Sequence, residues 1–242
     1  MLEPWRTGII TKIVQAAPAI KCFFIAVPEL LVFNFKPGQF VTLDLPIHEQ
    51  KNKRWRSYSI ASAPNNTNQF ELVIVLLEGG LGTTYLFNEV TIGSQLLLRG
   101  PAGVFTMPPV LDKDLYLICT GTGIAPFRSM LQYIHHHRIP HLNIYLIFGC
   151  RTLQDALYEE EMLALQANEP GFYYCPTFSR EEVVPSGYYQ GYVHAVYENL
   201  VNNNEAPANF YLCGWKNMID EARERLTNLG YEKKYIHYEL YG

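Results

Sequence analysis

Short segments in which apolar and polar residues alternate fill the first half of the chain. They are rich in β-branched and aromatic side chains, and prolines, glycines or asparagines separate them. This pattern predicts six strands, over residues 7–15, 20–27, 40–45, 56–61, 70–77 and 95–99. One helix is expected among them, from about Gly82 to Glu89. Six short strands joined by tight turns predict a small closed antiparallel barrel.

The second half of the chain has a different period. Residues 115–120 form a continuous apolar run, which is typical of a parallel strand that is buried on both faces. Similar strand patterns lie near 142–148, 172–178, 209–213 and 235–239, and they alternate with helical patterns near 127–137, 155–168, 193–202 and 217–229. This alternation predicts an open parallel α/β sheet.

The two patterns meet at a proline pair, Pro108-Pro109. We therefore expect two domains, an antiparallel six-stranded β-barrel over residues 1–107 and an α/β domain over residues 111–242.

The strand at 56–61 carries an unusual set of side chains. On an extended chain Arg56 and Tyr58 share one face, while Ser57 and Ser59 share the other. An arginine fork suits a phosphate, and a tyrosine ring suits a flat aromatic group. Taken alone, however, these residues favour an ordinary edge strand with an exposed arginine.

Two glycine-containing turns stand at expected helix starts. Gly82-Thr83-Thr84 would expose free backbone amides, which attract anions, although the same residues also serve as a simple helix cap. Gly121-Thr122-Gly123 follows the apolar run at 115–120, and Pro126 suits the first turn of the next helix. This is not the complete dinucleotide fingerprint, because Pro126 stands where a third glycine would.

The order of the motifs along the chain resembles that of the ferredoxin–NADP reductase family. The motifs are Lys36-Pro37-Gly38-Gln39-Phe40, Arg56-Ser57-Tyr58-Ser59, Gly80-Leu81-Gly82-Thr83-Thr84, Gly100-Pro101-Ala102-Gly103, Gly121-Thr122-Gly123-Ile124-Ala125-Pro126, Phe148-Gly149, Ser179-Arg180, Cys213-Gly214 and Tyr238-Glu239-Leu240-Tyr241. Each motif is weak alone, but the shared order is specific. The resemblance implies an enzyme with a flavin-binding barrel and a nucleotide-binding α/β domain.

The resemblance also implies the flavin site. Its residues would be Arg56, Ser57, Tyr58, Ser59, Gly82, Thr83 and Thr84. FAD is expected rather than FMN because FAD is commoner in the family. Glu78 stands roughly where plant-type members carry a tyrosine that stacks on adenine, so the adenine contact stays open.

A nicotinamide dinucleotide is the second implied cofactor. Its residues would be Thr120, Gly121, Thr122, Gly123, Pro126, Ser179, Arg180, Tyr188 and Tyr241. Ser179-Arg180 resembles the pair that binds the 2′-phosphate of NADP, but Ser186-Gly187 replaces a basic residue that often precedes the tyrosine. NAD therefore remains an alternative, as does a surface turn in which Arg180 pairs with a neighbouring glutamate.

The reaction implied is electron transfer between NADPH and a one-electron carrier through FAD, with Ser59, Cys213, Glu239 and Tyr241 as catalytic residues. A flavin can hold one or two electrons, so it connects a hydride donor to an iron–sulfur protein. The five cysteines form no cluster motif, so the carrier, a ferredoxin or flavodoxin, should be a separate protein. The alternatives are an NADH-dependent reductase component of a multicomponent oxygenase, a free-flavin reductase, and a non-catalytic electron-relay subunit.

Composition and charge exclude other classes. Hydrophobic residues make up 48% and charged residues 17%, as in a globular protein, and no apolar run reaches the length of a membrane span. The N-terminus lacks a signal-peptide pattern, so a cytoplasmic protein is expected. The first 110 residues carry nine basic and seven acidic side chains, which is too small a basic excess for nucleic acid. The consecutive residues His135–His137 point about 100° apart on a helix, so no metal site is expected.

Overall fold

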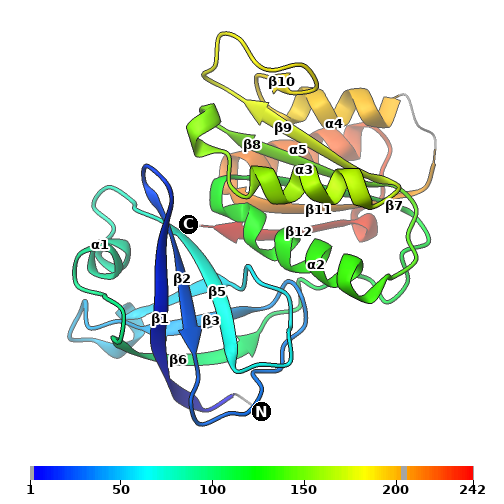
Figure 1. Ribbon diagram of the computed structural model, residues 1–242. Coiled ribbons are helices and arrows are strands. Elements are labelled where there is room, and N and C mark those ends of the chain that lie inside the picture. Colours follow the sequence, from blue (N-terminus) through cyan, green and yellow to red (C-terminus); the bar gives the residue numbers. More distant parts are fainter. Residues whose placement is uncertain (1–2, 203–205, 242) are drawn as a thin grey trace. The chain divides into compact units, whose positions relative to one another are not determined.

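A computed structural model describes residues 3–202 and 206–241. The chain divides into two compact units. One consists of Met1–Met107 and Ala125–Tyr133, and the other of Pro108–Ile124 and Ile134–Gly242. Each unit contains a six-stranded sheet (Figure 1).

The first sheet is antiparallel throughout. Its strands are β1 (Trp5–Ala17), β2 (Ile20–Ala26), β3 (Phe40–Asp44), β4 (Trp55–Ser59), β5 (Gln69–Val75) and β6 (Gln95–Ala102), in the order β4-β3-β6-β1-β2-β5. An isolated antiparallel bridge between Ile60 and Leu72 joins the two ends of this sheet. The amide of Ala61 also donates to the carbonyl of Glu71 at 2.8 Å. The sheet therefore closes, and the predicted six-stranded barrel is confirmed.

Alternation along the strands fills the barrel. Leu43 and Leu98 are opposite each other on β3 and β6, and both are completely buried. The helix α1 (Leu81–Asn88) follows β5, close to the predicted 82–89. Lys21 of β2 donates to the carbonyl of Phe87, at 3.0 Å, near the C-terminal end of this helix. A cation there complements the helix dipole and fixes α1 to the barrel.

The second sheet is parallel throughout. Its strands are β7 (Asp114–Thr120), β8 (Ile144–Cys150), β9 (Phe172–Phe178), β10 (Tyr189–Gln190), β11 (Ala208–Trp215) and β12 (Ile236–Tyr241), in the order β10-β9-β8-β7-β11-β12. The strands β7 to β10 follow one another across the sheet, and the chain then crosses from β10 to β11 on the other side of β7, so the direction of strand addition reverses there. Ligands of such sheets bind beyond the carboxyl ends of the strands near this reversal.

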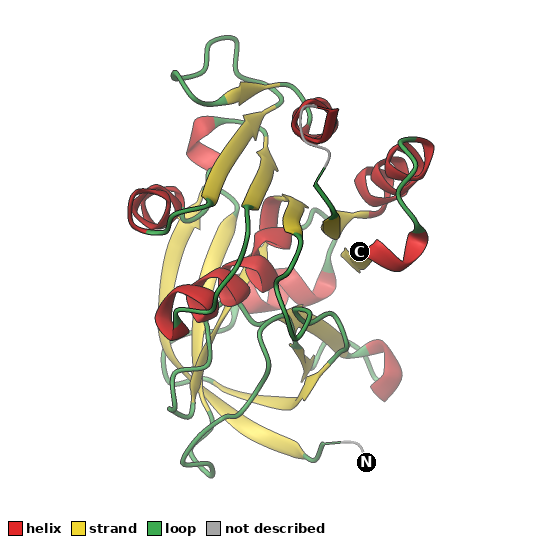
Figure 2. Ribbon diagram, turned by 90° about the vertical axis from the view of Figure 1, so that its right-hand side faces the viewer, coloured by secondary structure: helices red, strands yellow, loops and turns green. Residues whose placement is uncertain are grey.

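Helices cover both faces of the second sheet (Figure 2). They are α3 (Glu159–Asn168), α4 (Val193–Asn202) and α5 (Lys216–Asn228). The helix α2 (Ile124–His137) follows β7 in the chain, and most of it belongs to the first unit. Figure 1 shows α3 on the near face and α4 and α5 on the far face. The predicted α/β fold is confirmed. No helix in the two described ranges is long and apolar enough to cross a membrane.

Two details differ from the sequence prediction. A helix was expected over 155–168, but α3 begins only at Glu159. Thr152 and Asp155 form a capping box that closes a separate 3₁₀ turn, and Tyr158 adopts a left-handed conformation with φ of 57°. The short strand β10 was not predicted, because two residues carry too little periodic signal.

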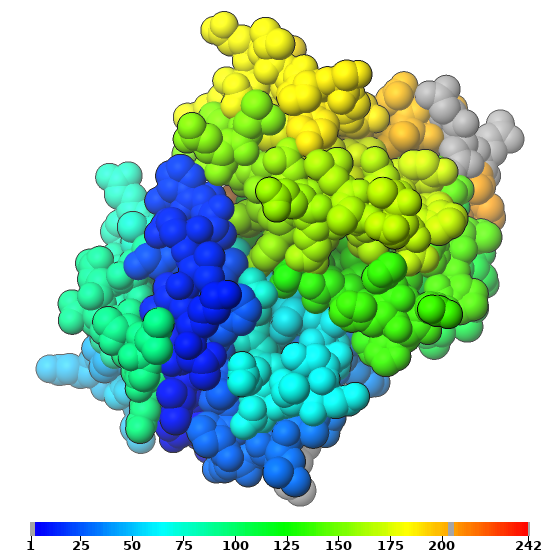
Figure 3. All heavy atoms as spheres, in the orientation of Figure 1, coloured from blue at the N-terminus to red at the C-terminus, as the bar shows by residue number. Residues whose placement is uncertain are grey.

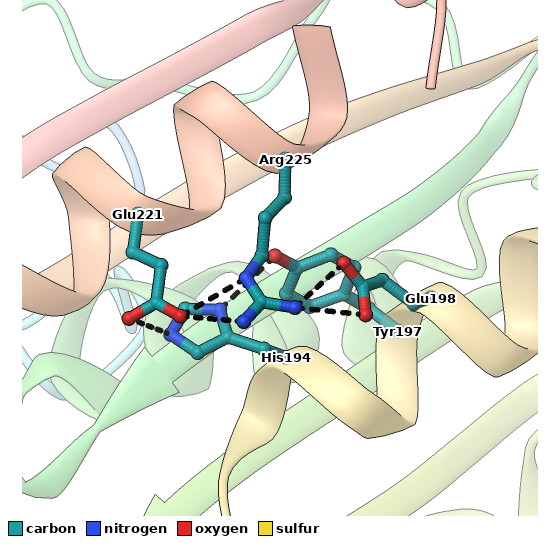
Figure 4. Close-up of polar contacts among 5 residues, drawn as sticks. All are labelled: His194, Tyr197, Glu198, Glu221 and Arg225. Carbon is teal, nitrogen blue, oxygen red and sulfur yellow. Dashed lines mark hydrogen bonds and ion pairs between the residues drawn. The ribbon is translucent and has the colours of Figure 1, made fainter. Parts of the chain in front are cut away.

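A polar cluster joins α4 to α5 on the far face of the sheet (Figure 4). Arg225 donates to both carboxylate oxygens of Glu198, at 2.9 and 3.0 Å, and also to Glu221 at 2.7 Å. His194 lies between Glu221, 3.4 Å from Nε2, and the Tyr197 hydroxyl, 3.0 Å from Nδ1. Burial is the main cause that lowers the pKa of His194, so the neutral imidazole is favoured in the folded protein.

Candidate functional site

In the first unit, the side chain of Arg56 lies against the first turn of α1. Arg56 is half-buried, opposite Leu43 on β3. A Cβ atom added to Gly82 would lie 3.0 Å from Arg56 Cγ and 3.3 Å from its Nε. Two carbonyls, of Lys53 and Trp55, accept from Arg56 Nη1 at 3.0 and 2.8 Å. The fold thus brings a strand cation and a helix N-terminus together.

The threonines in this turn have different surroundings. The buried Thr83 hydroxyl donates to the Gly80 carbonyl and accepts from the Leu77 amide, both at 3.1 Å, so it fixes the loop before the helix. The amide of Thr84 donates to the Gly80 carbonyl at 2.9 Å, while its side chain is exposed. The first three amides of α1 lie ahead of the helical bonding pattern. Together with Arg56, they make a site that can hold an anion.

The remaining strand residues provide a ring and hydroxyl groups. Tyr58 packs against the barrel core, and burial raises its pKa to about 12, although the Arg56 charge acts in the opposite direction. The phenol is therefore neutral at physiological pH. Ser59 is buried, whereas Ser57 is exposed and its hydroxyl lies 3.0 Å from that of Thr42.

In the second unit, the Gly121–Gly123 turn packs directly on β11. A Cβ at Gly123 would lie 2.3 Å from the Cys213 carbonyl oxygen, and one at Gly214 would lie 2.4 Å from Thr120 Oγ1. These contacts need glycine. The Thr120 hydroxyl is buried and has no hydrogen-bond partner among the described residues. A buried polar atom without a partner is unusual, and its place at the carboxyl end of a central strand marks this end of the sheet as a candidate ligand site.

Three expected catalytic residues meet at the same end of this sheet. Cys213 of β11 is opposite Glu239 of β12, and Tyr241 follows two residues later on the same face as Glu239. Burial raises the pKa of Cys213 well above its usual range, and the Glu239 charge adds to this effect, while the Tyr241 hydroxyl acts in the opposite direction. The thiol therefore stays protonated.

Ser179 and Arg180 follow the last residue of β9, as predicted. The amide of Ser179 donates to the Cys150 carbonyl at 3.0 Å, and the amide of Arg180 donates to the Arg151 carbonyl at 2.9 Å. Arg151 is thus the neighbour of Arg180 across the ends of β8 and β9, and both side chains are exposed. Within residues 3–202 and 206–241, no ion pair involves either guanidinium group.

The alternative, in which Arg180 of a surface turn pairs with Glu181 or Glu182, finds no such ion pair among the described residues. The carboxylate of Glu181 instead accepts from the Leu153 amide at 2.7 Å. Tyr188 lies just before β10, and its ring stacks on Phe178 with centroids 5.7 Å apart. Figure 3 shows the loop that carries it, in yellow, at the surface of the second unit.

Comparison with known proteins gives the family. Residues 8–107 match the family model described as an oxidoreductase FAD-binding domain, and residues 117–224 match that of an oxidoreductase NAD-binding domain. Ferredoxin–NADP reductase B of Sorangium cellulosum is 35% identical over 215 residues, which cover 86% of each chain. The chain belongs to the ferredoxin–NADP reductase family. It is an FAD-dependent oxidoreductase, and the recognition from motif order is confirmed.

The chain is also similar to a solved reductase structure and to reductase subunits of oxygenases. The solved structure of a ferredoxin–NADP⁺ reductase from Neisseria gonorrhoeae with bound FAD and NADP is 25% identical, with a TM-score of 0.82 and 98% of both chains covered. The glycine betaine monooxygenase reductase subunit of Chromohalobacter salexigens is 24% identical, and the match covers 96% of this chain but 62% of that protein. FAD and a nicotinamide dinucleotide are the cofactors of the reductase.

Sequence reasoning missed Arg151. The resemblance would place a second basic residue just before Tyr188, where Ser186-Gly187 stands, whereas Arg151 lies at the end of the neighbouring strand. The sequence did contain a signal. Arg151 comes directly after β8, and Arg180 comes two residues after the end of β9. Carboxyl ends of adjacent parallel strands share one edge.

Proposed function

We propose that this reductase transfers electrons between NADPH and a separate one-electron carrier protein through FAD. The observation that carries the proposal is the contact of Arg56 with the first turn of α1 at Gly82, which forms an anion site on the flavin strand itself. A phosphate group there would be bound by a guanidinium fork and by helix amides together.

At the flavin site, Arg56, the amides of Gly82 and Thr83 and the exposed hydroxyl of Thr84 would bind the pyrophosphate. Tyr58 would provide an aromatic face for the flavin ring, and Ser57 and Ser59 of the same strand would provide hydroxyl groups for hydrogen bonds to it. FAD, when bound, supplies the exchange between a two-electron hydride and single electrons. The flavin half is proposed to end at residue 107 and the nucleotide half to begin at residue 111.

At the nucleotide site, the turn of Gly121, Thr122 and Gly123 binds the pyrophosphate, with Pro126 fixing the first turn of α2. The Thr120 hydroxyl, which lacks a partner among the described residues, bonds the nicotinamide end. The protonated Cys213 thiol lies on that side, since burial keeps its pKa high. Glu239 orients the nicotinamide or holds a proton there, and Tyr241 occupies the nicotinamide position until the dinucleotide binds.

Preference for NADPH rests on two cations. Arg180, with Ser179 and the neighbouring Arg151, provides a doubly basic site for the 2′-phosphate, and Tyr188 stacks on the adenine. Arg151→Ala and Arg180→Ala should each raise KM for NADPH roughly tenfold or more, the usual cost of a lost charge-assisted bond, and leave KM for NADH nearly unchanged. Lys234→Ala is the matched control, because it removes an exposed cation elsewhere in the second unit. Equal losses with both dinucleotides would refute the 2′-phosphate assignment.

A surface patch supports the separate carrier. Trp5, Trp55, Leu97 and Arg99, called here the Trp–Arg patch, lie on the outer face of the barrel, since the intervening Leu98 is buried inside. The Arg99 guanidinium lies 4.8 Å from the Trp5 ring centroid and 5.1 Å from that of Trp55. Trp55 and Leu97 are exposed, whereas Trp5 and Arg99 are half-buried. Tryptophan and arginine side chains at a surface are typical of protein interfaces. A ferredoxin or flavodoxin with acidic side chains fits this patch and the exposed lysines beside it, Lys51 and Lys53.

A second candidate is the NADH-dependent reductase component of an oxygenase. Its support is the similarity to reductase subunits such as that of Chromohalobacter salexigens. The ratio of kcat/KM for NADPH to that for NADH separates the two candidates. If Arg151 and Arg180 bind the 2′-phosphate, this ratio should favour NADPH. A strong preference for NADH would favour the oxygenase component. A cytoplasmic location stays a prediction.

The first experiment is to identify the flavin. The purified protein should be yellow, and heat should release about one noncovalent FAD per chain, as expected for a single site. A colourless protein that fails to take up FAD in a titration would contradict the proposal.

A further inference from the structure

Tyr188 is held at two points in the second unit. One face of its ring stacks on Phe178, with an interplanar angle of 28°. Its hydroxyl donates to Glu159 Oε1 at 2.6 Å. The loop from β9 to Tyr188 is largely exposed, including Glu182, Val183 and residues 185–187. Because the rest of the loop is exposed, these two contacts position the Tyr188 ring.

Glu159 owes its place to the unusual start of α3. The left-handed Tyr158 precedes it, so Glu159 is the first residue of the helix. A carboxylate at a helix N-terminus is stabilised as the anion by the helix dipole. An ionised carboxylate is a strong acceptor for a phenol.

The titration behaviour of Tyr188 agrees with this geometry. Burial, the hydrogen bond to Glu159 and the Glu159 charge together raise the pKa of Tyr188 to about 12. The phenol therefore remains a donor throughout the physiological range. It can therefore donate to Glu159 at any pH in that range.

We propose that Glu159 is a positioning residue that fixes the Tyr188 ring so that its face away from Phe178 receives the adenine of the dinucleotide. The inference rests on the proposed function, which assigns adenine stacking to Tyr188. A ring that is already oriented loses little conformational freedom when the ligand binds. Adenine takes no part in the hydride transfer, so Glu159 contributes to binding and not to the chemical step.

The test measures the affinity of the holoenzyme for adenosine 2′,5′-bisphosphate by calorimetry, together with KM and kcat for NADPH. Glu159→Ala should weaken fragment binding and raise KM roughly threefold to tenfold, while kcat stays the same. Glu159→Gln keeps an acceptor oxygen and should restore most of the affinity. Glu160→Ala is the matched control, since it removes a neighbouring charge from the same helix turn at an exposed position.

A double-mutant cycle then decides how Glu159 acts. If it works through the Tyr188 hydroxyl, Glu159→Ala should have almost no further effect in a Tyr188→Phe background. Equal effects in both backgrounds, or an unchanged fragment affinity in Glu159→Ala, would overturn the inference.

Failure of the underlying assignment gives a different result. If Tyr188→Ala leaves the fragment affinity unchanged, Tyr188 does not stack on adenine, and the role proposed for it is wrong. If Tyr188→Ala weakens binding and Glu159→Ala does not, only the inference about Glu159 is wrong. Thermal unfolding of each holoenzyme identifies a variant that fails to fold, and for such a position the Gln or Phe variant carries the test.

Discussion

The close contact between Gly82 and Arg56 yields a quantitative prediction about flavin binding. A Cβ at position 82 would lie 3.0 Å from Arg56 Cγ, 3.3 Å from Arg56 Nε and 3.4 Å from Leu45 Cδ1. The first two distances are shorter than ordinary contacts. Since Leu45 is completely buried in the core, the arginine side chain has to move.

The expected magnitudes have opposite signs for folding and for binding. Alanine in place of glycine within a helix favours folding by about 0.5–1 kcal/mol. Complete loss of a charge-assisted hydrogen bond costs about 1.5–3 kcal/mol, or roughly ten- to a hundredfold in affinity. Gly82→Ala displaces Arg56 without removing it, so we expect FAD affinity to fall roughly three- to tenfold, and Arg56→Ala to reach the full loss.

The assay is a titration of apoprotein with FAD, followed by flavin fluorescence, with thermal unfolding of the same apoprotein as the stability control. Gly82→Ala should bind FAD more weakly without a lower unfolding temperature. In the Arg56→Ala background, Gly82→Ala should have little further effect, because the displaced group is absent. Lys53→Ala is the matched control, because Lys53 is an exposed cation three residues before Arg56. Undiminished FAD affinity in Gly82→Ala, or additive losses in the double variant, would refute the reasoning.

Three further predictions concern other parts of the molecule. Trp55→Ala should raise KM for the carrier protein several-fold without changing ferricyanide reduction, because it removes one ring of the Trp–Arg patch and leaves the cofactor sites intact. An unchanged KM for the carrier would exclude this patch as its docking site. Tyr241→Ser should tighten binding of oxidised NADP and relax discrimination against NADH, because the ring no longer competes with nicotinamide; unchanged affinity and preference would exclude that role. His194 has a lowered pKa in the folded state, so the unfolded chain protonates first and stability should fall as pH drops below about 6.5. His194→Gln should reduce this slope in urea unfolding, and the exposed control His136→Gln should not.

Much of the fold was predictable because the spacing of apolar residues in the sequence matches the residues that are buried in the structure. Alternation marked the barrel strands, and the continuous apolar run at 115–120 corresponds to β7, whose residues 114–119 are all buried. The glycine turn at 121–123 was also predictable as the link between an apolar strand and a helix.

Other features depend on contacts that a linear pattern does not contain. Arg151 adjoins Arg180 only because β8 and β9 are parallel neighbours that end at the same edge. The start of α3 at Glu159 depends on the left-handed Tyr158, a conformation that a tyrosine seldom adopts. The Thr83 hydroxyl could have faced solvent, but it bonds within the loop before α1, so only its amide is left for an anion.

The most direct test of the proposed electron path is an anaerobic titration of the yellow holoenzyme. NADPH should bleach the absorption of one FAD per chain, and oxidised ferredoxin added afterwards should restore it, with two ferredoxin molecules reduced for each NADPH consumed because the carrier takes single electrons. A flavin that neither NADPH nor NADH reduces would contradict the account. So would a flavin that is reduced but passes electrons to no one-electron carrier.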